Sequence, residues 1–274
     1  MRSRIGALFF RYLAADDMAS RSRNDAPMRL ALLADVHSNL EALQACLEHA
    51  RVAGADRYAF LGDLVGYNAD PVAVIDLVRS HADAGAVVVM GNHDAAVVDE
   101  PSEFMGVGVA EAIRWTRRQL DEDRLAFLAH LPLTARDGDC FFVHASADAP
   151  ERWTYIHDGW RAAFSMEAAQ ATYVFCGHVH EPMLYFVGAD QRPQPFQPVP
   201  GVPIPVAGHR HWLTIVGSCG QPRDGNPAAC YAMLDTGQPS LTYWRVPYDA
   251  ETAAYKVRAA GLPGEFARRL ERGF

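Results

Sequence analysis

The sequence predicts an α/β fold in which two β-sheets pack back to back. Strand-like and helical segments alternate in a βαβαβ order near the start of the chain, and the later part is mostly strand-like. Polar residues that end successive apolar runs are spaced close to the ~30 residues of a strand-helix-strand unit. Together, these observations fit two packed sheets better than a Rossmann sheet.

The elements follow from apolar runs and helix signals in chain order. Apolar residues recur at helical spacing over 40–53, and proline stands in the first turn expected for 71–82. Helices are expected at 40–53, 71–82, within 108–129 with a break near Asp121, at 159–169, and in the tail 249–272. Strands are expected at 29–34, 58–61, 86–90, 131–136, 140–143, 173–176, 183–187, 212–216, 229–234 and 241–245.

One stretch of the later part does not read as a strand. Residues 191–205 contain six prolines and three glutamines. Proline has no N–H to donate and cannot pair well in the centre of a sheet. We therefore expect an irregular crossing of the surface there.

Length and composition favour one domain over residues 28–274, with a helical C-terminal tail. The chain has 274 residues, 50% of them hydrophobic and 21% charged, enough for one large core. Residues 1–27 differ, because their apolar stretch 5–10 is shorter than a signal core. This segment is either a flexible extension or a misassigned start, with translation beginning at Met28 in the second case.

Charge and cysteine usage limit the function classes. A formal net charge of -8 argues against nucleic acid as an electrostatic partner, although nucleotides stay possible. Five scattered cysteines without a C-x-x-C motif indicate neither a disulfide framework nor a zinc knuckle. No segment reaches the ~18 apolar residues of a membrane span. We expect a cytoplasmic enzyme with a small substrate, and a homo-oligomer stays open.

Five polar clusters each close an apolar run. From His37 to Asp63 is 26 residues and from Asp63 to Asn92 is 29. Successive strand-helix-strand units therefore return polar side chains to one sheet edge, where active sites of open α/β sheets lie. The clusters are Asp35-Val36-His37, Gly62-Asp63, Gly91-Asn92-His93-Asp94, His144 and Gly177-His178-Val179-His180.

These clusters predict a site for two divalent metal ions. They supply carboxylates, an amide and imidazoles without a thiolate, a set that suits manganese, iron or zinc. Asp35 and His37 are two residues apart, as are His178 and His180, so in an extended segment each pair would point the same way and grip a metal from one side. Two divalent cations would leave a formal positive surplus of about one charge after the carboxylates of Asp35 and Asp63 and a bridging hydroxide are counted, and this surplus attracts phosphate.

In their order, the clusters resemble the calcineurin-like metallophosphoesterase superfamily. Residues 35–43, 62–67 and 217–227 resemble its prokaryotic branch of small phosphodiesterases. The resemblance implies a four-layer α-β-β-α sandwich of two mixed sheets and a dinuclear site. It assigns Asp35, His37, Asp63 and His180 to one metal, and Asp63, Asn92, His144 and His178 to the other, with Asp63 bridging.

The resemblance also implies a mechanism. A metal-bridging hydroxide would attack phosphorus while the two cations hold the other phosphoryl oxygens. His93, next to Asn92 in the sequence, would assist the leaving group as the catalytic residue.

Several neighbouring residues keep two interpretations. Arg223 either binds substrate phosphate or braces its loop through a salt bridge with Asp224 or a neighbour. Tyr67 and Asn68 are further candidates for substrate contact. Asp94 is expected to cap the following helix, and Asn39 is either a cap or a residue that orients a ligand. Aromatic residues after His144, namely Trp153, Tyr155 and Trp160, favour packing over a lid.

Three functions stay open. The first is a metal-dependent phosphodiesterase or phosphomonoesterase, with the diesterase favoured. The second is hydrolysis of phosphoproteins or dinucleoside polyphosphates by the same site. The third is a scaffold that keeps the fold without the chemistry, but the seven ligand positions and His93 are intact, which argues against it.

Overall fold

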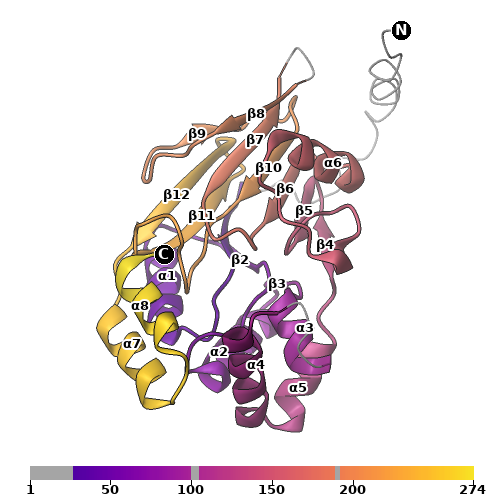
Figure 1. The fold of residues 1–274 in the computed structure, drawn as a ribbon. Helices are drawn as coiled ribbons and strands as arrows, with labels where there is room; N and C mark the ends of the chain where they lie inside the picture. The colour runs from indigo at the N-terminus through magenta and orange to yellow at the C-terminus, as the bar shows by residue number, and fades with distance from the viewer. Residues whose placement is uncertain (1–26, 100–104, 189–191) are drawn as a thin grey trace, which may run out of the picture.

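A computed structural model describes residues 27–99, 105–188 and 192–274, which form two six-stranded mixed sheets (Figure 1). The segment 1–27, predicted to be an extension or a misassigned start, lies outside the described residues except for Pro27. The first sheet has the order β3-β2-β1-β11-β12-β9, with β1 Arg29–Leu33, β2 Arg57–Phe60, β3 Val87–Val88, β9 Ile204–Pro205, β11 Ala229–Asp235 and β12 Ser240–Val246. The second has the order β4-β5-β6-β10-β7-β8, with β4 Thr134–Asp137, β5 Cys140–Val143, β6 Tyr173–Cys176, β7 Met183–Val187, β8 Pro193–Phe196 and β10 Trp212–Ile215.

Helices cover both outer faces, so the predicted four-layer sandwich is confirmed. Alternation along β1 shows the layering: Leu30 and Leu32 face the second sheet, whereas Ala31 and Leu33 pack with the helices. On the other outer face, Met166 of α6 packs against the second sheet. The helices are α1 Leu40–Val52, α2 Pro71–Asp83, α3 Asn92–Asp99, α4 Val107–Gln119, α5 Glu122–Ala129, α6 Gly159–Ala169, α7 Ala250–Ala259 and α8 Gly264–Arg272.

The break near Asp121 is confirmed. Asp121 caps α5 by accepting a hydrogen bond from Arg124 N at 3.0 Å, which starts a new helix after α4.

The prediction of an irregular surface crossing at 191–205 is wrong in part. Two short strands form there, β8 and β9, and each lies at the edge of a different sheet. An edge strand has one side without ladder partners, so it tolerates the prolines that a central strand would not.

The C-terminal tail forms a helical hairpin of α7 and α8 that packs beside α1 and α4 (Figure 1). Lys256 of α7 pairs with Asp70, the N-cap of α2, at 2.8 Å and also with Glu41 of α1. The tail is therefore anchored on the helical layer that covers the first sheet.

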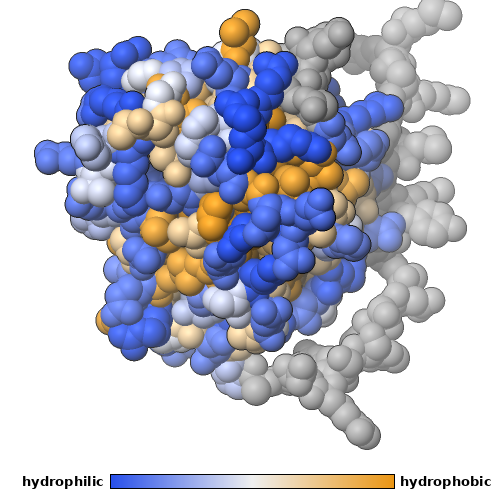
Figure 2. Space-filling view, turned by 90° about the horizontal axis from the view of Figure 1, so that it is seen from below, coloured by the Kyte–Doolittle hydropathy of each residue, from blue (hydrophilic) through white to orange (hydrophobic). Residues whose placement is uncertain are grey.

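The face in Figure 2 is mostly hydrophilic, with an apolar band across its middle. All five cysteines are free and buried, as small core residues. None of the helices in the described part of the chain has the length and apolar content needed to cross a bilayer.

Candidate metal centre

The predicted ligands converge although they come from both sheets. Each follows the carboxyl end of a strand, or begins the helix after it, so the strand ends bring them to one edge. Two groups of side chains have ligand atoms within 4.8 Å of one another, and Asp63 belongs to both. The first group contains Asp35, His37, Asp63 and His180, and the second contains Asp63, His144 and His178.

The first group is completely enclosed. His37 Nε2 lies 3.1 Å from His180 Nε2 and 3.6 Å from Asp63 Oδ2. Asp35 Oδ1 lies 3.3 Å from His180 Nε2. All four side chains are buried, so the carboxylates are shielded from bulk water.

The second group surrounds the other side of Asp63. His144 Nε2 lies 3.4 Å from Asp63 Oδ2, 3.1 Å from His178 Nδ1 and 3.1 Å from the side-chain oxygen of Asn92. Because Asp63 Oδ2 approaches both His37 and His144, one carboxylate oxygen lies between the two groups.

Hydrogen bonds from the Nδ1 side of three imidazole rings leave their Nε2 atoms able to bind cations. The Nδ1 atoms of His37, His144 and His180 lie 3.1, 2.7 and 2.7 Å from backbone carbonyl oxygens. A carbonyl only accepts, so in a neutral ring Nδ1 carries the proton and Nε2 presents a lone pair to the site. Two such lone pairs, on His37 and His180, would repel each other at 3.1 Å without a positive charge beside them.

The electrostatics of the site show the same demand for positive charge. Burial opposes a charge on His144, but the carboxylates of Asp63 and Asp35 outweigh it and raise its pKa to about 9. Burial also opposes ionisation of Asp63, yet His144, His93 and His37 hold its pKa well below the usual value. A proton on His144 thus supplies charge that a divalent cation would supply at the same place.

The local backbone differs from the extended one assumed from the sequence. Five of the seven candidate ligands have positive φ, between 49° and 69°: Asp35, His37, Asp63, His178 and His180. The extended backbone on which the two-residue spacing argument depended is therefore absent at these ligands. Asp35 and His37 still belong to one group, whereas His178 and His180 belong to different groups. Left-handed backbone costs about 1–2 kcal/mol per non-glycine residue, and such strain gathers at functional sites.

Glycines next to the ligands allow the chain segments to touch. A Cβ at Gly91 would overlap the backbone nitrogen and a carboxylate oxygen of Asp63. A Cβ at Gly177 would lie 2.5 Å from Asp35 Oδ2. These contacts explain physically why glycine precedes the polar residues in two of the clusters.

Gly91→Ala is expected to lower stability by about 1–3 kcal/mol, the usual cost of overpacking, and to weaken metal binding by displacing Asp63. Thermal unfolding with and without added Mn²⁺ measures both effects. Gly106→Ala is the matched control, because nothing lies within 4 Å of a Cβ at that position. A metal-induced stabilisation as large in Gly91→Ala as in Gly106→Ala would contradict the role given to this contact.

Asp94 does not cap a helix as the sequence suggested. It lies inside the first turn of α3 and accepts hydrogen bonds from Val65 N at 3.2 Å and Gly91 N at 3.0 Å. Burial and the charge of Asp63 raise its pKa to about 7. Asp94 therefore ties together the two loops that carry Asp63 and Asn92, a contact that has no local signal in the sequence.

Two asparagines orient the chain around the site. Asn39 caps α1 through Ala42 N at 3.1 Å, which confirms the cap interpretation. Its side chain also donates to Gly220 O at 2.8 Å and hydrogen-bonds to no candidate ligand among the described residues. Asn68 is 2% exposed and donates to the carbonyl of His37 at 2.8 Å. Asn68 therefore holds the backbone of His37, and its contact with substrate stays a prediction.

His93 lies beside the ligands without joining either group. Its backbone N–H donates to Asp63 Oδ1 at 2.8 Å, and its ring packs 4.6 Å from Tyr67 and 4.8 Å from His37. The buried Nδ1 has no hydrogen-bond partner among the described residues. Burial lowers the pKa of His93 to about 4, although Asp63 acts in the opposite direction.

Arg223 stands at the rim, and the predicted salt bridge with Asp224 is absent from the described residues. Asp224 pairs instead with Arg245. The Arg223 guanidinium donates to Tyr67 Oη at 3.2 Å and to Gln221 Oε1 at 3.1 Å. Burial lowers the pKa of His37 well below its usual value, and the charge of Arg223 adds a smaller effect in the same direction. Sequence reasoning missed Gln221, whose carbonyl also accepts from His180.

Aromatic residues after His144 are less buried than expected. Tyr155 is 45% exposed and stacks on His178 at 3.9 Å, and Trp153 meets the edge of His144 at 5.9 Å. Trp160 is 70% exposed, so the packing role favoured for it is wrong. Tyr155 and Trp153 therefore form one wall over the second group.

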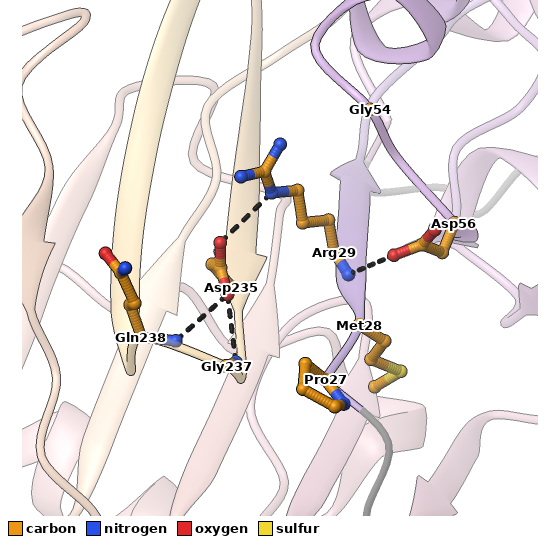
Figure 3. Close-up of a pocket in the computed structure, with 8 residues that line it drawn as sticks. All are labelled: Pro27, Met28, Arg29, Gly54, Asp56, Asp235, Gly237 and Gln238. Carbon is orange, nitrogen blue, oxygen red and sulfur yellow. Dashed lines mark hydrogen bonds and ion pairs between the residues drawn. The ribbon is translucent and has the colours of Figure 1, made fainter.

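A separate hollow of about 500 Å³ lies at the start of β1, the opposite end of the strand from Asp35 (Figure 3). Arg29 donates there from its backbone to Asp56 at 2.8 Å and from Nε to Asp235 at 3.0 Å. The polar groups that line the hollow are thus hydrogen-bonded to one another, and neither of the two His/Asp groups found in the described residues lies there. We assign no function to it.

Comparisons with known proteins agree with this geometry. A family model described as a calcineurin-like phosphoesterase superfamily domain matches residues 28–238. An uncharacterized protein of Methanocaldococcus jannaschii is 32% identical over 247 residues, which are 88% of this chain and 96% of that protein.

Two solved structures extend the comparison. A metallophosphoesterase from Sphaerobacter thermophilus has a TM-score of 0.80 and 35% identity, and the match covers 91% of this chain and 100% of that chain. A hypothetical protein from Pyrococcus horikoshii has a TM-score of 0.73 at 18% identity, covering 90% and 98%, and so supports the fold alone.

Proposed function

The chain belongs to the calcineurin-like phosphoesterase superfamily, a family of metal-dependent phosphoesterases, and from this premise we propose that it hydrolyses phosphodiesters with two divalent metal ions. The observation that carries the proposal is the pair of buried His/Asp groups that share Asp63. Manganese, iron and zinc all suit these oxygen and nitrogen ligands.

The residues present divide between two ions. Asp35, His37, Asp63 and His180 would hold one. Asp63, His144 and His178 would hold the other, with the Asn92 oxygen beside His144 as a further ligand. When bound, such ions lower the pKa of water to give a nucleophile and offset charge on phosphoryl oxygens.

Side chains outside the two groups would handle the substrate. The Arg223 guanidinium is placed at the rim by Tyr67 and Gln221, where its planar donors suit a phosphoryl oxygen. The His93 ring is neutral at neutral pH because burial lowers its pKa, so it would offer an N–H dipole to the leaving oxygen. Tyr155 would limit the space beside His178.

Charge supports a diester over a monoester. A diester carries one negative charge at neutral pH and a monoester close to two. The Arg223 guanidinium is the cationic side chain hydrogen-bonded at this rim, and His93 adds no charge at neutral pH. One guanidinium held by hydrogen bonds beside the ligands matches the single charge that a diester carries at the reacting phosphorus.

Removal of metal with a chelator is expected to lower hydrolysis of bis(p-nitrophenyl) phosphate by at least about a hundredfold, since the nucleophile depends on the cations. Adding back Mn²⁺, Fe²⁺ or Zn²⁺ separately, with metal analysis of the protein, identifies the ion. A higher kcat/KM for p-nitrophenyl phosphate than for the diester would replace the diesterase with a monoesterase. Full activity in the presence of chelator would rule out a metal-dependent mechanism.

A further inference from the structure

We propose that α8 supplies a second anion subsite, in which Arg269 acts with Arg223 to bind a further phosphate carried by the substrate's leaving group. This inference rests on the proposed function and deepens it, because it names the substrate class: phosphate esters whose leaving group bears a second phosphate. Residues 264–272 lie beyond the span 28–238 that the family model matches.

One aromatic ring connects the candidate metal centre to both arginines. The Tyr67 ring lies 4.6 Å from the His37 ring and 4.6 Å from the His93 ring. The Arg223 guanidinium carbon lies 5.6 Å from the centre of the Tyr67 ring, and that of Arg269 lies 5.9 Å from it. Only the Tyr67 ring therefore separates each guanidinium group from the histidines of the candidate metal centre.

Neither arginine has a carboxylate partner among the described residues. The acidic neighbours in sequence are engaged elsewhere, since Asp224 pairs with Arg245 and Glu271 pairs with Arg258. The Arg269 side chain makes no hydrogen bond to the part of the chain that the structure describes, although its backbone carbonyl accepts from Gly273 N. The buried Nε of Arg223 also lacks an acceptor there. Unpaired guanidinium donors at a half-buried site are satisfied best by phosphate oxygens.

Backbone contacts hold the two arginines in a fixed relation. Gly225 N, in the loop that carries Arg223, donates to Gly273 O at the end of α8 at 2.9 Å. Phe266 of α8 packs against Tyr67, with the ring centres 4.9 Å apart. Arg269 also lies over the Phe266 ring at 5.6 Å, which restricts its side chain. A subsite fixed before binding loses little conformational entropy when the ligand arrives.

The position of His93 indicates that the second phosphate belongs to the leaving group. His93, the proposed partner of the leaving oxygen, contacts the same Tyr67 ring that Arg269 covers. A leaving group that passes His93 therefore runs along Tyr67 towards α8. The competing explanation is that Arg269 only packs on two rings and offsets the dipole at the C-terminus of α8.

The test compares two non-hydrolysable probes, propylphosphonate and 1,3-propylenediphosphonate, by calorimetric titration of the full chain loaded with Mn²⁺. The wild type is expected to bind the diphosphonate at least about tenfold more tightly, a difference typical of one charged hydrogen-bonded pair. Arg269→Gln is expected to remove most of this ratio, and Arg269→Lys, which keeps the charge, to remove less. Arg268→Gln, at the exposed adjacent position of the same helix, is expected to keep the ratio.

Other outcomes overturn the inference in distinguishable ways. An unchanged ratio in Arg269→Gln, or an equal loss for both probes, would show that Arg269 is a packing residue. Equal binding of both probes by the wild type would remove the second subsite and leave the proposed function standing. Failure of both probes to bind the Mn²⁺-loaded wild type would overturn the proposed function as well. Arg269→Lys keeps the test valid if the glutamine variant unfolds.

Discussion

Asp63→Asn is expected to lower turnover on the order of 10³-fold in the presence of excess Mn²⁺. Asp63 Oδ2 lies 3.6 Å from His37 Nε2 and 3.4 Å from His144 Nε2, so one carboxylate serves both groups. An amide removes the negative charge that two cations would share, and a loss of several kcal/mol of charge stabilisation corresponds to this factor.

The same change is expected to lower the metal content. The two groups contain only two carboxylates, Asp35 and Asp63, so the substitution removes half of their negative charge. Metal analysis after gel filtration, alongside kcat/KM for the diester, measures both effects. Asp83→Asn, an exposed change at the end of α2, is the matched control and is expected to alter neither. An Asp63→Asn protein that retains two ions and normal turnover would rule out a shared aspartate.

The sequence was sufficient to predict which side chains meet, because each cluster follows the carboxyl end of a strand and these ends lie together although they belong to two sheets. His144 illustrates this, since it belongs to no local motif and was selected for its place between the G-N-H-D and G-H-x-H clusters, at the end of the apolar run 140–143. The structure places it within 3.4 Å of Asp63. Long-range order of clusters therefore carried more information than any single cluster.

Local geometry could not be predicted in the same way. The left-handed backbone at Asp35 and His37 has no signature in residue type, because such strain persists only where surrounding contacts enforce it. The bonds of Asp94 to Val65 and Gly91 depend on two loops meeting in space. Arg269 is about 200 residues from Tyr67 in the sequence, so their contact follows only from the folded position of α8.

His93→Ala is expected to keep both metal ions yet slow hydrolysis by about 10²–10⁴-fold for esters with poor leaving groups, and much less for nitrophenyl esters. The imidazole belongs to neither ligand group, and its link to Asp63 is a backbone N–H that alanine retains. A nitrophenolate leaves readily without assistance, whereas an alkoxide needs a hydrogen bond or a proton.

The contrast between leaving groups separates this role from a structural one. The His93 ring packs against Tyr67 and His37, so alanine also leaves a cavity, which would slow all substrates alike. His93→Asn refills part of that space and can donate a hydrogen bond without passing on a proton. If the His93→Ala protein loses metal and its residual rate does not depend on the leaving group, then His93 supports metal binding and the leaving-group role assigned to it is wrong. If asparagine restores part of the rate on alkyl esters, the neutral ring acts as a hydrogen-bond donor, which agrees with its pKa of about 4.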